Sequence, residues 1–336
     1  MIQAYARRTG TLSEAVVTDV VTVRDLRVGF PRGGAWREVV AGIDFDISSG
    51  RTLGIVGESG CGKSVTSLAL MGLVPAPGRV GGSVTFRDRE LVGQSEAAWR
   101  KLRGNGIAMV FQEPMTALNP VMPVGRQIAE SMVIHRGESW REAQSTAIGL
   151  LESVGINSPK QRAASYPHQL SGGMRQRAMI AMALACEPAL LIADEPTTAL
   201  DVTIQAQILD LMLDLQDRTG MAMQFISHNL AVVSEIAHEI CVMYAGRIVE
   251  RAPSDALFTD PLHPYTQGLI ATLPDPAHRV ARLPVIPGGV PDLVGGRGCR
   301  FADRCPRVDA GCRAAEPELV AYAPGHSAAC FKAGQG

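Results

Sequence analysis

The octapeptide Gly57–Ser64 (GESGCGKS) has the residue types and spacing of a phosphate-binding loop. It follows an apolar run at 52–57 and precedes a helical pattern at 63–72. Glycines let consecutive backbone N–H groups curl around phosphate, and the N-terminus of the following helix faces the anion. Lys63 would reach the β- and γ-phosphates of a nucleotide, and the Ser64 hydroxyl would bind Mg²⁺. An ordinary glycine-rich turn is the alternative, but the strand and helix on either side disfavour it.

A second set of chemical groups ends the apolar run LLIAD at 190–194. A buried strand that ends in two acids places carboxylates at the carboxyl edge of an α/β sheet, where such sheets bind ligands. Asp194 would then hold the Mg²⁺ ion, and Glu195 would act as the general base that polarises the attacking water. A strand followed by an acidic helix cap is the alternative.

The segment LSGGMRQR at 170–177 is expected to open a strongly amphipathic helix. Ser171 is a good N-cap, and the pair Gly172–Gly173 lets the backbone approach an anion closely. Taken alone, this segment indicates only a capped helix start.

Two single polar residues come directly after apolar strands. Gln112 follows the run at 106–111, so its amide could reach a metal ion or a water molecule. His228 follows the run at 222–227, so its imidazole could contact a γ-phosphate. A lone glutamine or histidine in such a place is more often structural, so these residues matter only together with the loop and the acidic pair.

Apolar strands alternate with helical patterns, which predicts an α/β fold with a mainly parallel sheet covered on both faces. The β-branched runs between residues 20 and 49, joined by a turn at 31–34, predict an antiparallel β region. Helical periodicity extends from 116 to about 186 and covers 205–220. Strands are expected at 52–57, 82–91, 106–111, 190–194 and 222–227, and more than one within 239–252.

Composition limits the class of protein. The chain has 336 residues, 46% of them hydrophobic, which is enough for one large domain and an addition. A formal net charge of -1 does not support broad binding to nucleic acid or to acidic membranes. No apolar run approaches the roughly 18–20 residues of a transmembrane helix, and the N-terminus lacks the apolar region of a secretory signal. A soluble, cytoplasmic protein is therefore expected, with any membrane crossing left to another chain.

In this order, the motifs resemble the nucleotide-binding subunit of an ATP-binding cassette (ABC) transporter, from about residue 20 to 260. The resemblance implies a P-loop NTPase (RecA-like) domain at 20–255, with an antiparallel β subdomain, a helical subdomain at about 113–186 and a tail at 1–19. It implies binding of ATP and Mg²⁺. The ATP contacts that it implies are Phe30, which would stack on adenine, and Gly57, Glu58, Ser59, Gly60, Cys61, Gly62, Lys63, Ser64, Val65 and Gln112.

The same resemblance gives roles to the remaining motifs. It implies Mg²⁺ binding by Ser64, Gln112 and Asp194, catalysis by Glu195 and His228, a signature that includes Ser171, Gly172, Gly173 and Gln176, and a D-loop at Ala199–Asp201. The family works as a head-to-tail dimer, so the signature would contact the ATP of a second subunit. Two ATP molecules would close the dimer, and hydrolysis at Glu195 would let it open.

The segments HPYT at 263–266 and CRFADRC at 299–305 resemble the C-terminal region of the oligopeptide and dipeptide importer subfamily, over about 253–332. This implies an ATPase at the cytoplasmic face of the membrane that energises the import of di- or oligopeptides. The implied partners are two permease subunits, an extracytoplasmic substrate-binding protein and a second, paralogous ATPase. Nickel or haem is an alternative cargo. A soluble ABC ATPase of DNA repair or translation and a cluster-carrier protein are alternative classes, but no nucleic-acid partner is expected.

Four of the seven cysteines lie in this extension, which is assigned to 256–336. They are Cys299, Cys305, Cys312 and Cys330. Four thiolates can hold a 4Fe–4S cluster or a tetrahedral zinc ion, and the lack of close C-x-x-C pairs favours the cluster. The resemblance implies the cluster as well. A site that binds nothing remains the third possibility, because a single buried cysteine often serves only as a small apolar side chain.

Overall fold

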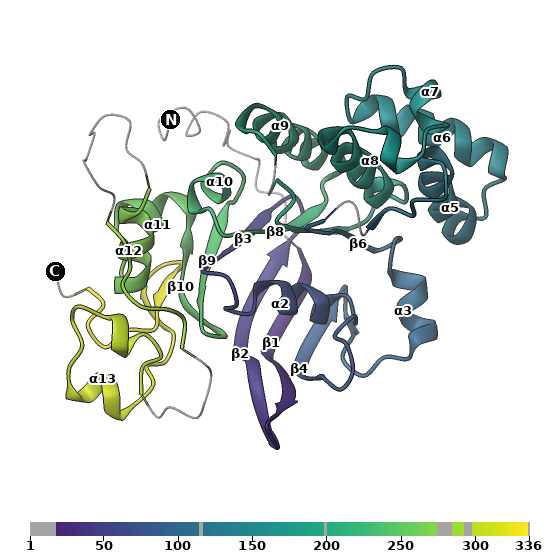
Figure 1. The fold of residues 1–336 in the computed structure, drawn as a ribbon. Helices are drawn as coiled ribbons and strands as arrows, with labels where there is room; N and C mark the ends of the chain where they lie inside the picture. The colour runs from purple at the N-terminus through teal and green to yellow at the C-terminus, as the bar shows by residue number, and fades with distance from the viewer. Residues whose placement is uncertain (1–17, 114–116, 198–199, 274–283, 292–297, 335–336) are drawn as a thin grey trace.

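The computed structural model describes residues 18–113, 117–197, 200–273, 284–291 and 298–334. The expected tail at 1–19 therefore lies almost wholly outside the described residues. Within them, the strands form a four-stranded sheet in the order β2-β1-β4-β5 and an eight-stranded sheet in the order β11-β12-β10-β9-β3-β8-β7-β6. Figure 1 shows a helical region at one end of the molecule and the C-terminal extension at the other.

The four-stranded sheet is antiparallel, as the sequence predicts. Its strands are β1 (Asp19–Arg32), β2 (Ala35–Ser48), β4 (Arg79–Phe86) and β5 (Arg89–Glu90). The single strand predicted over 82–91 is wrong, because Arg87 and Asp88 both have positive φ and turn the chain into the β4–β5 hairpin. Two central residues with positive φ match the twist of paired strands, and the aspartate tolerates this conformation.

The large sheet is parallel at its centre, and the predicted apolar runs at 52–57, 106–111, 190–194 and 222–227 each form one of its strands. The parallel strands are β3 (Thr52–Val56), β6 (Ile107–Val110), β7 (Leu190–Asp194), β8 (Ala222–Ser227) and β9 (Glu239–Tyr244). Alternate residues face different layers. Leu190 and Ile192 pack in the core shared with the antiparallel sheet, whereas Leu191 and Ala193 pack in the core shared with the helices. Apolar side chains on both faces therefore follow from helices or strands covering both sides.

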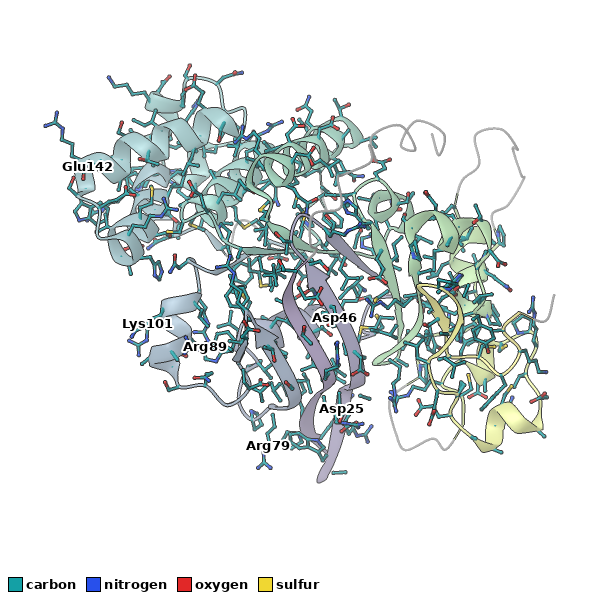
Figure 2. The ribbon with its side chains drawn as sticks, turned by 180° about the vertical axis from the view of Figure 1, so that it is seen from behind. Asp25, Asp46, Arg79, Arg89, Lys101 and Glu142 are labelled. Carbon is teal, nitrogen blue, oxygen red and sulfur yellow. The ribbon has the colours of Figure 1, made fainter. Side chains whose placement is uncertain are left out.

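Most helices around the sheets lie where the sequence predicts them. The helices are α2 (Lys63–Leu70), α3 (Glu96–Leu102), α5 (Val124–Arg136), α6 (Trp140–Ser153), α7 (Pro159–Ala163), α8 (Gly172–Leu184), α9 (Val202–Thr219) and α10 (Leu230–Ser234), with a 3₁₀ turn, η1 (Pro167–Gln169). Of these, α3 and α10 were not predicted. A capping box between Ser139 and Glu142 starts α6, and Figure 2 shows Glu142 at the outer end of the helical region.

Helix α8 differs from the expectation of strong amphipathicity. Its second half, from Ala178 to Leu184, is buried except at Met182, which is half-buried. The helix lies against α5, α6 and β6, so neighbours on several sides cover it. A helix that is surrounded in this way is apolar around most of its circumference. In the described part of the chain, no helix combines the length and apolarity that a membrane span requires.

The extension is more regular than the sequence suggests. It contains α11 (Ser254–Thr259), α12 (Pro264–Ala271), η2 (Ala302–Arg304), α13 (Ala310–Ala314), β11 (Val320–Ala323) and β12 (His326–Ala328). Strand β12 pairs with β10 (Arg247–Pro253), so the extension continues the large sheet of the cassette. Strands of three and four residues are too short to produce a recognisable alternation, which explains why the sequence did not reveal them.

A buried carboxylate fastens this extension to the sheet. Glu250 of β10 is fully buried, and its oxygens accept hydrogen bonds from the backbone N–H groups of Leu262 (2.7 Å) and His263 (2.9 Å). His326 Nε2 of β12 lies 2.8 Å from Glu250 Oε1. A buried carboxylate is tolerated only with such partners, so these three contacts hold the start of α12 and the β12 strand together.

The substitution Glu250→Ala should lower the free energy of unfolding by about 3 kcal/mol, because it leaves His326 and two backbone N–H groups without their buried acceptor. Denaturant unfolding would measure the loss, and limited proteolysis should cut the extension first. As a control, Asp303→Ala removes an exposed ion pair with Arg313 and should change stability by less than ~1 kcal/mol. Equal stability of the two variants would contradict this role of Glu250.

Candidate nucleotide-binding site

The phosphate loop lies between β3 and α2, as the sequence predicts. Gly57 and Gly62 have φ values of 155° and 106°. A Cβ atom would lie 2.1 Å from the Met243 carbonyl oxygen at Gly57, and 2.8 Å from the Val39 carbonyl oxygen at Gly62. Both positions therefore require glycine for backbone conformation and for space. Ser59 and Gly60 are exposed at the tip of the loop, where a phosphate can approach.

Lys63 is 5% exposed, and its ammonium group folds back over the loop. Nζ donates hydrogen bonds to the carbonyl oxygens of Gly57 (2.8 Å) and Glu58 (3.0 Å). A phosphate is a stronger, charged acceptor than a carbonyl group, so a nucleotide in the loop can take over this ammonium group.

A pair of oxygen ligands lies beside the loop. The exposed Ser64 hydroxyl donates a hydrogen bond of 3.2 Å to Asp194 Oδ1, at the end of β7. Asp194 is 5% exposed, and burial raises the pKa of its carboxyl group above the usual value. A hydroxyl and a carboxylate are the oxygen ligands that Mg²⁺ prefers, and a cation there would compensate for the buried negative charge.

Three predicted residues from three strand ends meet at Glu195. Glu195 Oε2 accepts a hydrogen bond from Gln112 Nε2 at 3.2 Å and lies 3.1 Å from His228 Nδ1. Its side chain is 13% exposed, whereas Gln112 and His228 are exposed. Glu195 has a φ of 47°, which is unusual for a residue with a side chain. Strained backbone of this kind often occurs at functional sites, and here it aims the carboxylate between the amide and the imidazole.

The other predicted ATP contacts surround the loop. Phe30 of β1 is partly buried, because the chain at Gly78 packs against its ring: a Cβ at Gly78 would lie 2.4 Å from Phe30 Cε1. Only part of the ring is therefore open for stacking. Val65 is partly buried on α2. Cys61 is fully buried, and burial raises the pKa of its thiol, so it acts as a small apolar side chain in the loop.

The signature segment caps α8. Ser171 Oγ accepts a hydrogen bond from the backbone N–H of Met174 at 3.3 Å. Ser171 and Gly172 are exposed, and a Cβ at Gly172 would meet nothing within 4 Å. At Gly173 it would lie 3.2 Å from Ile204 Cγ2. Packing within the chain therefore gives no reason for glycine at position 172.

Two further predicted site residues differ in exposure: Gln176 is buried and Asp201 is exposed. The Gln176 side chain is 2% exposed, so it does not reach the surface on which Ser171 lies. Asp201 is exposed and caps α9, accepting a hydrogen bond from the backbone N–H of Ile204 at 2.9 Å. Ala199, at the start of the predicted D-loop, lies outside the described residues.

Two residues that the sequence did not reveal as part of the site contact the phosphate loop. Tyr265 belongs to the HPYT segment, Arg304 belongs to the CRFADRC segment, and both contact Glu58. The only signal in the sequence was the presence of these two segments, which indicates a subfamily and says nothing about a contact with the loop.

The four cysteines of the extension line one small cavity together with His263. The backbone N–H groups of Arg307 and Lys332 each donate to a sulfur atom, of Cys305 and Cys330 respectively, at 3.4 Å. Burial, reinforced by the neighbouring thiols, raises the pKa of Cys299 to about 11. Among the described residues, no group of three or more His, Cys, Asp or Glu side chains is arranged to hold a metal ion.

The fold and this site define an ABC ATPase cassette. Residues 40–198 match the family described as ABC transporter, and residues 249–312 match the oligopeptide/dipeptide transporter C-terminal region. A solved dimeric structure of MJ0796, a bacterial ABC transporter cassette, aligns with a TM-score of 0.63 and 24% identity. The alignment covers 70% of this chain and 98% of the MJ0796 chain. The similarity shows that the two chains share a fold.

Curated relatives extend the similarity over nearly the whole chain. The probable peptide ABC transporter ATP-binding protein y4tR of Sinorhizobium fredii is 53% identical over 320 residues, covering 94% of this chain and 96% of the relative. The dipeptide transport ATP-binding protein DppD of Escherichia coli is 49% identical over 313 residues, which cover 93% of this chain and 96% of DppD. The oligopeptide transport ATP-binding protein AppD of Bacillus subtilis is 46% identical over 318 residues, which cover 94% of this chain and 97% of AppD. The chain belongs to the ABC transporter ATP-binding proteins with an oligopeptide/dipeptide transporter C-terminal region.

The raised pKa of Asp194 leads to a prediction. At pH 7 its buried charge destabilises the nucleotide-free protein, so Asp194→Asn should raise the melting temperature by about 2 °C while Mg²⁺-dependent ATP hydrolysis is lost. The difference in melting temperature should shrink as the pH falls through the raised pKa, because the native carboxyl group then becomes neutral too. Calorimetry over a pH series would measure it.

The matched control is Asp214→Asn, which changes an exposed aspartate on α9. It should affect neither the melting temperature nor hydrolysis. A lower melting temperature for Asp194→Asn at every pH would contradict the account of the buried charge.

Proposed function

We propose that this protein is the ATP-hydrolysing subunit that energises the import of di- or oligopeptides through a multi-subunit ABC transporter. The observation that carries the proposal is the convergence of a phosphate loop, the pair Ser64–Asp194 and the Glu195 carboxylate at one edge of the parallel sheet. The peptide cargo is supported by relatives that are named for peptide or dipeptide transport over almost their full length.

The chain's own side chains supply the steps of hydrolysis. The loop amides and Lys63 bind the phosphates, while Ser64, Asp194 and Gln112 would hold Mg²⁺, which neutralises charge on the β- and γ-phosphates. Glu195 would accept the proton of the attacking water. Its carboxylate is held between Gln112 and His228, so it is already oriented before nucleotide arrives. The His228 imidazole would then turn to the γ-phosphate as a donor.

A second ATPase subunit would complete each site. The exposed N-cap Ser171 and the open space at Gly172 support this, because the first N–H groups of α8 can meet an anion that comes from outside the chain. Gly173 would be the third signature contact, and Asp201 would lie at the interface. Gln176 is excluded from that contact by its burial. We expect the second subunit to be a paralogue, so that the ATPase pair is a heterodimer.

The remaining partners would be two permease subunits and an extracytoplasmic substrate-binding protein, with this chain at the cytoplasmic face of the membrane. The helical region, which starts just beyond Gln112, would carry the motion of the ATPase to the permeases. Nickel or haem is the alternative cargo, and an uptake assay with labelled dipeptides in a strain lacking the gene would distinguish them. Co-purification with nucleic acid instead of membrane subunits would favour a soluble ABC ATPase.

The substitution Glu195→Gln should lower the rate of ATP hydrolysis at least ~100-fold, because the amide cannot accept the proton of the attacking water. ATP binding should persist, since the phosphate loop is untouched, and the ATPase pair should stay closed. Phosphate release and retained ATP in the assembled transporter are the measurements.

Glu152→Gln provides the control, because Glu152 is an exposed glutamate near the end of α6. It should hydrolyse ATP like the wild type. Normal hydrolysis by Glu195→Gln would show that another residue is the base.

We also propose that Cys299, Cys305, Cys312 and Cys330 hold a 4Fe–4S cluster that stabilises the extension. The four thiols line one cavity, and two of the sulfur atoms accept backbone N–H bonds, which favour ligand thiolates. A tetrahedral zinc ion needs its sulfurs about 3.8 Å apart, from Zn–S bonds of ~2.3 Å. The same four thiolates are a ligand set for either group, so the metal content of the purified protein distinguishes the cluster from zinc.

The cluster proposal predicts iron and sulfide in about equal amounts in anaerobically purified protein, with a broad brown absorbance. Cys312→Ala should lose most of the iron, because a ligand is missing from the cavity. Cys186→Ala is the control: this cysteine is buried elsewhere and should leave the iron content unchanged. Stoichiometric zinc without iron, or full iron in Cys312→Ala, would contradict the cluster.

A further inference from the structure

Glu58, the second residue of the phosphate loop, has every one of its polar groups bound. Its carbonyl oxygen accepts from Lys63 Nζ at 3.0 Å, and its backbone N–H donates to the Tyr265 hydroxyl at 2.9 Å. Its carboxylate binds Arg304. Lys63 belongs to the loop itself, but Tyr265 lies on α12 and Arg304 lies at the end of η2 in the cysteine-rich extension.

The contact between Arg304 and Glu58 is a two-pronged ion pair. Arg304 Nη1 donates to Glu58 Oε2 at 2.8 Å, and Nη2 donates to Oε1 at 2.9 Å. The Arg304 side chain is 6% exposed and that of Glu58 is 27% exposed. Two parallel charge-assisted bonds in a largely buried setting fix orientation as well as distance. This pair therefore restrains the rotation of the Glu58 side chain and, through it, the loop.

The extension holds Arg304 itself in place from several directions. Arg304 Nε donates to the Pro287 carbonyl oxygen at 2.7 Å. The guanidinium lies 5.7 Å from the centre of the Tyr244 ring and 5.9 Å from that of Phe301. Tyr244, Tyr265 and Phe301 pack on one another with ring centres 4.7 to 5.4 Å apart. The guanidinium thus packs on an aromatic cluster that joins β9, α12 and the cysteine-rich segment.

The neighbourhood of Arg304 connects it to the cysteine cavity. Cys305 follows it directly in the chain, and Phe301, which packs under its guanidinium, lines the same cavity as the four cysteines. A displacement of the cavity lining would therefore move the aromatic cluster and the guanidinium with it.

We propose that Arg304 is a positioning residue for the nucleotide site: it holds the phosphate loop through Glu58, so the cysteine-rich extension sets the ATP affinity of its own subunit. The inference rests on the proposed nucleotide site. A loop that is competent for phosphate only part of the time binds ATP more weakly in proportion to that fraction. The loop contains glycines with wide conformational freedom, and the Glu58 carbonyl also holds Lys63, so releasing the carboxylate loosens both phosphate-binding elements.

The test measures ATP binding by the full-length subunit, with a fluorescent ATP analogue as the probe, and the KM for ATP and kcat of the assembled transporter. Arg304→Gln should raise the Kd and the KM about 10-fold, while kcat at saturating ATP stays within about 2-fold. Arg304→Lys keeps the charge but loses the two-pronged geometry, so it should restore part of the affinity. A merely structural role would lower the amount of active protein and kcat instead of raising KM.

The control is Arg313→Gln, which removes the same charge from an exposed pair with Asp303 in the same extension. It should leave the Kd unchanged. Glu58→Gln and the double variant Glu58→Gln/Arg304→Gln complete a double-mutant cycle. The Kd of the double variant should not exceed the higher Kd of the two single variants, because each substitution breaks the same interaction. If Arg304→Gln is too unstable to purify, Arg304→Lys and Glu58→Gln carry the same test.

A Kd for Arg304→Gln within 2-fold of the wild type, an equal rise for Arg313→Gln, or additive effects in the cycle would each overturn the proposal. Lys63→Ala separates this outcome from a failure of the nucleotide site. Lost ATP binding in Lys63→Ala with normal binding in Arg304→Gln would overturn only the positioning role. Normal ATP binding in Lys63→Ala would overturn the nucleotide site and the positioning role together.

Discussion

The register of the parallel strands determines where the chemistry of this protein can occur. Val56 of β3 lies opposite Ser227 of β8, Asp194 of β7 lies opposite Ile226, and Val110 of β6 lies opposite Ala193. All four strands therefore end at the same level, and the segments that follow them leave the sheet side by side. The phosphate loop, the acidic pair, the glutamine and the histidine come from segments far apart in sequence, yet the register of the sheet brings them to one edge.

At this edge of the sheet, two residues have energetically unfavourable arrangements that serve the chemistry of the site. Glu195 has a left-handed backbone, and Asp194 carries a carboxylate in a buried position. Neither arrangement stabilises the empty protein. Both place oxygen atoms where a nucleotide, its metal ion and a water molecule would need them, and the surrounding sheet is stable enough to hold them there.

The residues that meet at this edge of the sheet could be predicted because their signals are local. Glycine spacing, two acids after an apolar run and single polar residues after strands are each visible within a few positions of the chain. The Arg87–Asp88 turn was missed because it contains neither glycine nor proline, and β11 and β12 were missed because they are too short. The pairing of Arg304 with Glu58 spans 246 positions, and no periodicity or spacing can reveal a contact between single residues so far apart.

The sequence suggested a boundary near residue 255 between the cassette and the extension. The fully buried Glu250 determines what a truncation at that boundary would do. Its carboxyl group lies in the cassette's own strand, but its three partners, Leu262, His263 and His326, all lie beyond that boundary, and His326 follows Glu250 by 76 positions. A truncated protein that ends at this boundary would uncover the edge of β10 and leave the Glu250 carboxyl group without its hydrogen-bond partners. A gene fragment made to isolate the cassette would therefore need a replacement for Glu250 as well as a stop codon.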